Sequence, residues 1–104
     1  MNRVINLIKY LKEEKLEDLI HEGTHLVDFY ADWCGPCKML GSILETMEDV
    51  SIIKINVDEH PELAQQFGVM SIPTIIIFKN GLEIKKQIGF VPEEEIRNLL
   101  KEIN

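Results

Sequence analysis

The sequence predicts an α/β fold in which a central mixed sheet of five strands is flanked by four helices. Short apolar segments alternate with segments whose apolar residues recur every three to four positions, the arrangement expected for parallel strands joined by helices. Near the C-terminus, Asn80-Gly81 separates two strand-like segments and predicts a type I′ hairpin. This hairpin adds an antiparallel edge to the same sheet.

The elements of the first half follow from short apolar runs and helical spacing. Residues 4–7 are a candidate strand, residues 12–21 a helix, and residues 26–31 an apolar strand suited to burial on both faces. A longer helix is predicted from Cys34 to about residue 48, and Pro36 is tolerated in its first turn, where the N–H groups have no partner within the helix. Its apolar face consists of Met39, Leu40, Ile43, Leu44 and Met47.

The second half adds three strands and two helices. The strands are predicted over residues 51–57, 74–79 and 82–88, and the helices over 61–67 and 92–103. Each of these helices has a proline in its first turn, and acidic residues at 93–95 suit the N-terminus of the last one.

Length and composition are those of one ordinary folded domain. The chain has 104 residues, of which 45% are hydrophobic and 28% charged, and no repeat or Pro/Gly/Ser-rich linker divides it. A chain of this size buries about two-thirds of its unfolded surface, enough for one core without a metal or several disulfides. We expect a single domain over residues 1–104.

Charge and hydropathy argue against several classes of partner. The net charge of −7 disfavours nucleic acids and anionic membranes, because both repel an acidic surface. No stretch approaches the roughly 18 consecutive apolar residues of a membrane span. Residues 1–7 contain no apolar run long enough for a signal peptide, so we expect a cytoplasmic protein.

Cys34 and Cys37 are the only cysteines, and they lie at the start of a predicted helix. Residues three apart on a helical turn are about 5–6 Å apart, so a disulfide between them can open and close with little backbone movement. The free N–H groups and the helix dipole favour a thiolate at Cys34. A zinc site would need two further ligands with suitable spacing, and an inert core pair is the other alternative.

Three segments resemble the signatures of the thioredoxin family. Residues 27–39, Val-Asp-Phe-Tyr-Ala-Asp-Trp-Cys-Gly-Pro-Cys-Lys-Met, are similar to its active-site segment. Ile72-Pro73-Thr74 and Phe78-Lys79-Asn80-Gly81 are similar to its second and third signatures, at family-like separations. The resemblance implies the thioredoxin fold and a general protein-disulfide reductase.

The resemblance also implies roles within the dithiol segment. Cys34 would be the exposed nucleophile that attacks a substrate disulfide, and Cys37 would resolve the resulting mixed disulfide. Gly35 and Pro36 would set the reduction potential.

Asp28 and Lys54 are charges within apolar strands. Burial would raise the pKa of Asp28 toward neutrality, the range that a general base requires. In the family, the matching aspartate takes the proton of the buried thiol, and the matching lysine is its neighbour. From the pattern alone, both side chains could instead face solvent on edge strands.

A docking surface is implied around the proline of the second signature. An Ile-Pro bond is expected to be trans by frequency, but the resemblance implies a cis Ile72–Pro73 bond packed against the dithiol. Ile72 would then pair with an extended substrate segment. Trp33, Ile72, Pro73 and Gly89 would form an apolar docking surface, although each could also serve packing alone.

The sequence departs from the family pattern in three places. Tyr30 stands where many members have tryptophan, and Phe90 where smaller residues are frequent. Gly41-Ser42 replaces the usual helix proline; because Gly/Ser pairs are sites of sharp bends, we expect a softer bend and some loss of stability.

The implied partners are thioredoxin reductase, as electron donor, and disulfide-containing proteins, as substrates of a monomer. No glycine-rich dinucleotide fingerprint occurs, so we expect neither a cofactor nor a metal. Two other functions remain: an oxidant or isomerase of exported proteins, and a thioredoxin-fold binding subunit of a larger enzyme. The missing signal sequence disfavours the first, and the retained Cys34, Cys37, Asp28 and Lys54 disfavour the second.

Overall fold

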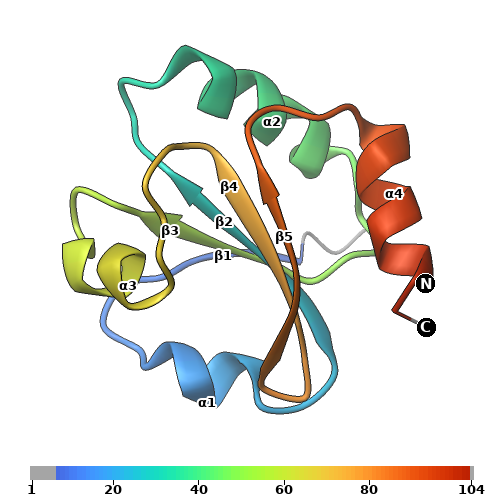
Figure 1. The fold of residues 1–104 in the computed structure, drawn as a ribbon, viewed down its shortest axis with the longest axis horizontal. Helices are drawn as coiled ribbons and strands as arrows, with labels where there is room; N and C mark the ends of the chain where they lie inside the picture. Colours follow the sequence, from blue (N-terminus) through green and yellow to red (C-terminus); the bar gives the residue numbers. More distant parts are fainter. Residues whose placement is uncertain (1–6, 104) are drawn as a thin grey trace, which may run out of the picture.

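The computed structural model describes residues 7–103, and its elements follow one another in the predicted order (Figure 1). The strands are β1 (Ile8–Tyr10), β2 (Thr24–Tyr30), β3 (Ile52–Asn56), β4 (Thr74–Lys79) and β5 (Leu82–Ile88). The helices are α1 (Leu16–Ile20), α2 (Gly35–Glu45), α3 (Pro61–Gln66) and α4 (Glu93–Lys101).

The five strands form one mixed sheet in the order β1-β3-β2-β4-β5. β3 pairs in parallel with β1 and β2, whereas β4 is antiparallel to both β2 and β5. Both central residues of the last hairpin have positive φ, 51° at Asn80 and 86° at Gly81, as a type I′ turn requires. The predicted mixed sheet with four flanking helices is confirmed.

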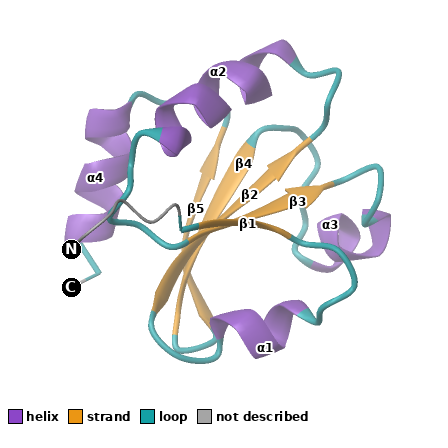
Figure 2. Cartoon of the chain, turned by 180° about the vertical axis from the view of Figure 1, so that it is seen from behind, coloured by secondary structure: helices purple, strands orange, loops and turns teal. Residues whose placement is uncertain are grey.

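Helices cover both faces of this sheet. Figures 1 and 2 show α1 and α3 on one face and α2 and α4 on the other. Alternation along β2 matches these layers, since Val27 and Phe29 pack with α1 and α3, whereas Leu26 packs with α2 and α4. Asp28 shares the parity of Leu26 and therefore points toward the α2 face.

No helix in residues 7–103 is long and apolar enough to cross a membrane.

All four helices are shorter than predicted: α3 ends at Gln66 rather than residue 67, and α4 covers Glu93–Lys101 rather than residues 92–103. For α1 and α2, side chains that bond the backbone account for the limits. α1 begins at Leu16 rather than residue 12, because Glu14 Oε1 accepts the N–H of Lys12 at 2.8 Å in a bend. α2 ends at Glu45 rather than residue 48, where Thr46 Oγ1 donates to the Ile43 carbonyl at 2.7 Å.

The first strand lies further along the chain than expected. It covers Ile8–Tyr10 rather than residues 4–7; Leu7 precedes it, and residues 4–6 lie outside the described residues. The shift brings Tyr10 into the sheet beside Lys54 of β3.

α2 is one continuous helix through Gly41 and Ser42. Ser42 Oγ donates to the Lys38 carbonyl at 3.2 Å, a contact that often accompanies helix bending. The expected loss of stability at this position stays a prediction.

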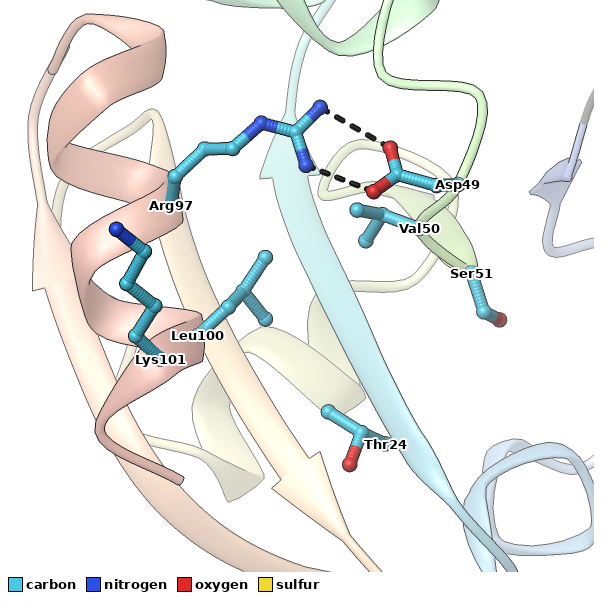
Figure 3. Close-up of a pocket in the computed structure, with 7 residues that line it drawn as sticks. All are labelled: Thr24, Asp49, Val50, Ser51, Arg97, Leu100 and Lys101. Carbon is cyan, nitrogen blue, oxygen red and sulfur yellow. Dashed lines mark hydrogen bonds and ion pairs between the residues drawn. The ribbon is translucent and has the colours of Figure 1, made fainter. Parts of the chain in front are cut away.

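A pocket of about 300 Å³ lies between α4 and the N-terminal ends of β2 and β3 (Figure 3). Arg97 of α4 donates two hydrogen bonds, 2.8 and 3.0 Å long, to the carboxylate of Asp49, and a third to Glu93. Asp49 and Glu93 already neutralise the Arg97 guanidinium, so the pocket is not an anion site. The contact between Arg97 and Asp49 instead ties α4 to the loop before β3.

Candidate active site at the C-terminal end of β2

Cys34 and Cys37 form a disulfide at the start of α2, directly after the loop that follows β2. Their Cα atoms are 5.2 Å apart, within the range expected for a helical turn. Cys34 is the N-cap of α2, and the N–H of Cys37 donates to Cys34 Sγ at 3.2 Å. When the bond is open, the same N–H and the helix N-terminus would stabilise a thiolate at Cys34.

Both cysteines are buried in the disulfide form. Cys34 is 5% exposed and Cys37 2%, so the expectation of an exposed Cys34 is wrong for this form. Its sulfur is joined to Cys37 and lies 3.9 Å from the carbonyl oxygen of Ile72, which explains the burial. Within residues 7–103, no group of His, Cys, Asp and Glu side chains could hold a metal ion, so the zinc interpretation finds no further ligands there.

Gly35 and Pro36 occupy the first turn of α2 between the cysteines, as the sequence predicts. Both are exposed. A Cβ added to Gly35 would meet no atom within 4 Å, so the fold itself does not require a glycine there. With no side chain at Gly35, the space beside this residue stays open.

Asp28 and Lys54 lie side by side in the middle of the sheet. The parallel register of β2 and β3 pairs them directly, and Lys54 Nζ is 3.3 Å from Asp28 Oδ2. Asp28 is fully buried and Lys54 is 8% exposed, so the alternative of solvent-facing residues on edge strands is wrong.

Burial raises the pKa of Asp28 from 3.8 to about 6, while the charge of Lys54 opposes the rise. Neither carboxylate oxygen receives a well-directed hydrogen bond from any residue in the described part of the chain. Among the described residues, Lys54 is therefore the main support of the ionised form, and a pKa of about 6 lets the carboxyl gain or lose its proton near neutral pH. A group with these properties can act as a base for a nearby thiol.

Tyr10 and Tyr30 complete the surroundings of Lys54. The ammonium lies 4.6 Å from the ring centroid of Tyr30 and 5.8 Å from that of Tyr10. Sequence reasoning missed Tyr10 because the first strand was placed too early; its β1 register opposite Lys54 is visible only in the folded sheet.

The Ile72–Pro73 bond is cis, as the resemblance implied, and Pro73 is buried directly before β4. The Pro73 carbonyl accepts the N–H of Gly89 at 2.8 Å, which brings the end of β5 beside this proline. Gly89 has φ +89°, a conformation that favours glycine. The structure thus brings Ile72, Pro73 and Gly89 together at the edge of the dithiol.

Trp33 is 70% exposed, so it is not a core aromatic. Its indole N–H donates to Asp58 Oδ2 at 2.9 Å, which fixes the ring on the surface next to Cys34. Trp33 and Ile72 line an apolar pocket of about 400 Å³ together with Met70, which is 96% exposed. Met70 and Asp58 were not predicted; the only sequence signal for Met70 was its place two residues before Ile72.

Comparisons with known proteins agree with this geometry. The thioredoxin family model matches residues 7–102. A thioredoxin of Chlamydia caviae is 41% identical over 92% of this chain and 98% of its own length. A thioredoxin of Staphylococcus saprophyticus is 43% identical over 86% of this chain and 90% of its own. The solved structure of a mutant thioredoxin from Halobacterium salinarum NRC-1 superposes with a TM-score of 0.84 at 35% identity, covering 91% of this chain and 88% of that one.

Proposed function

This chain belongs to the thioredoxin family and is a protein-disulfide oxidoreductase with a Cys34–Cys37 redox pair, and from that premise we propose how its residues divide the reaction. The observation that carries the proposal is the placement of this pair at the N-terminus of α2. One sulfur, Cys34 Sγ, accepts a backbone N–H there, and Asp28 lies in the sheet on the face that α2 covers.

In the first step the Cys34 thiolate attacks one sulfur of a substrate disulfide. A mixed disulfide forms, and the other substrate sulfur leaves as a thiolate. In the second step Asp28 accepts the proton of Cys37, and the Cys37 thiolate attacks Cys34 Sγ. The second substrate thiolate leaves, so the substrate has gained two electrons and the chain has become the disulfide.

Substrates would dock beside the disulfide on Trp33, Ile72, Pro73 and Gly89. An exposed tryptophan next to an apolar pocket supports this role, because such surfaces bury the extended segment around a target cysteine. Gly35 leaves the approach to the disulfide open. Gly35 and Pro36 together would tune the reduction potential.

The family implies disulfide-containing proteins as substrates and thioredoxin reductase as electron donor. We place the reaction in the cytoplasm and on a monomer of one domain, with neither nucleic acid nor membrane as partner. The net charge of −7 and the single sheet of the described residues support this view.

Insulin reduction driven by dithiothreitol tests the function. Wild type should outpace Cys34→Ser, and equal rates would contradict the proposal. Cys37→Ser should accumulate mixed disulfides with target proteins, whereas Cys34→Ser should not; accumulation in the reverse pattern would exchange the roles of the two cysteines. Equilibration with glutathione gives the potential, and a value well above about −230 mV would favour an oxidant or glutaredoxin-like role instead.

A further inference from the structure

The ammonium of Lys54 is enclosed by an unusual set of neighbours. Among the described residues, Asp28 is its one recorded ionic partner, at 3.3 Å, although the lysine is only 8% exposed. The ammonium also lies over the faces of Tyr30 and Tyr10, whose rings meet edge to face at 6.3 Å and 81°. An ammonium removed from water needs compensation, and aromatic faces supply part of it.

The sheet register produces this arrangement. Tyr10 of β1 pairs with Lys54 of β3, and Lys54 pairs with Asp28 of β2, so the three residues form one row across neighbouring strands. Tyr30 lies two residues after Asp28 and therefore on the same face. α2 closes the row from above, where a Cβ on Gly41 would come within 3.2 Å of Lys54 Nζ.

We propose that Tyr10 is a positioning residue for the disulfide reaction: together with Tyr30, it holds the Lys54 ammonium against Asp28. The inference rests on the proposed function, in which Asp28 is the base for Cys37. Tyr10 itself touches neither sulfur nor substrate in this scheme, and it acts through Lys54.

An alternative position is open to the Lys54 ammonium. A pocket of about 450 Å³ between α2 and the ends of β1 and β2 is lined by both Lys54 and Cys37, and two of its other lining residues are acidic. Without the Tyr10 face, the lysine could turn toward these acids and away from Asp28. The titratable and charged groups around the cluster are Tyr10, Tyr30, Asp32, Cys37, Lys38 and Glu45, and Glu59 acts on Tyr30.

The consequence is a change in the pH dependence of resolution. The charge of Lys54 lowers the pKa of Asp28 against the effect of burial, so moving that charge away raises the pKa of the carboxyl further above about 6. The base then becomes protonated at higher pH, and the resolving step slows first on the acid side of neutrality.

The test is a titration of the Asp28 carboxyl carbon by NMR in the oxidised protein. Tyr10→Leu should move the midpoint up by about 0.5 of a pH unit, the size expected for one cation–π contact. Tyr10→Phe keeps the aromatic face and should titrate as wild type does. Lys9→Leu removes a cation from the opposite face of β1 and should also leave the midpoint unchanged. Resolution by Tyr10→Leu should be about two-fold slower at pH 6 and unchanged at pH 8.

An unchanged midpoint in Tyr10→Leu, or an equal shift in Tyr10→Phe, would overturn the proposal. Tyr10 is 45% exposed, so both variants should fold. If Tyr10→Leu does not fold, pentafluorophenylalanine can replace Tyr10, because it keeps the ring but reverses the sign of the charge on its face. This variant must then raise the midpoint of the Asp28 titration. The titration needs no turnover. Failure of wild type to reduce insulin would therefore refute the proposed function and leave the result for Tyr10 standing.

Discussion

At the scale of single residues, the buried Asp28 lowers the stability of the fold. A fully buried carboxylate whose pKa is raised to about 6 is ionised at neutral pH at the expense of folding free energy. The Lys54 ammonium, 3.3 Å from Asp28 Oδ2, offsets part of that cost. Neither carboxylate oxygen receives a well-directed hydrogen bond from residues 7–103 that would offset the rest. Such an arrangement is expected where a base is needed close to a buried thiol.

Asp28→Asn should therefore stabilise the protein while slowing resolution. The folded-state pKa of about 6 exceeds the ordinary 3.8, so the folded state retains the proton longer, and stability falls as the pH rises from about 3.8 through 6. Removing the ionisable group should raise the free energy of unfolding at pH 8 by up to about 3 kcal/mol, less the cost of leaving Lys54 unpaired. Urea unfolding at pH 8 and pH 4 measures this; an equal gain at both pH values would contradict it.

At the scale of elements, two glycines near the dithiol have different reasons for being glycine. Gly89 has φ +89° and follows β5, where its N–H reaches the Pro73 carbonyl. Gly35 has an ordinary backbone conformation and open space around its Cα. The backbone conformation requires the first, whereas the proposed approach of a substrate to the disulfide would account for the second.

Gly89→Ala should lower the free energy of unfolding by about 1–2 kcal/mol, because an L side chain is strained at this φ. Gly35→Ala is the matched control and should leave stability unchanged or raise it by up to about 1 kcal/mol, because alanine fits the open space and restricts the unfolded chain. Thermal unfolding of the two variants gives the comparison. A Gly89→Ala variant as stable as Gly35→Ala would show that the backbone at residue 89 relaxes without strain.

Ser42→Pro tests whether α2 is bent where its sequence departs from the family. If Ser42 already sits in a bend, a proline fits the backbone and restricts the unfolded chain, and the melting temperature should rise by about 2–6 °C. The bond from Ser42 Oγ to the Lys38 carbonyl supports that geometry. An unchanged or lowered melting temperature would indicate a regular helix, in which proline removes a bond and clashes.

Elements that carry a strong local pattern were predicted almost to the residue. The limits of β4 and β5 are correct because Asn80-Gly81 fixes the turn between them; the register then shifts between Ile77 and Phe78, which the turn does not predict. The start of α1 was wrong because a bond between Glu14 and the Lys12 N–H competes with the helix, which apolar spacing does not reveal. The contact of Tyr10 with Lys54 depends on strand order and could not be predicted from spacing at all.

At the scale of the whole molecule, the dithiol lies at one end of the sheet beside apolar side chains, on a protein of net charge −7. The pairing of β4 with β5 runs from Thr74, next to Pro73, to the hairpin at Lys79 and Leu82. Met70 lines the apolar pocket beside the dithiol with Trp33 and Ile72, at the proposed docking surface, whereas Leu82 lies at the hairpin, at the other end of β5. Only the first should matter for a protein substrate.

Met70→Asp should raise KM for a protein disulfide about ten-fold, because it replaces apolar contact area with a charge that must be desolvated on docking. Leu82→Asp is the matched control, since Leu82 is also exposed, at 67%, and the substitution adds the same charge. Neither change should alter the rate at which the reduced protein reduces a small disulfide such as oxidised dithiothreitol. Such a molecule reaches Cys34 without covering Met70. Equal effects of the two substitutions on the protein substrate would point to the net charge, rather than to a docking surface, as the determinant of recognition.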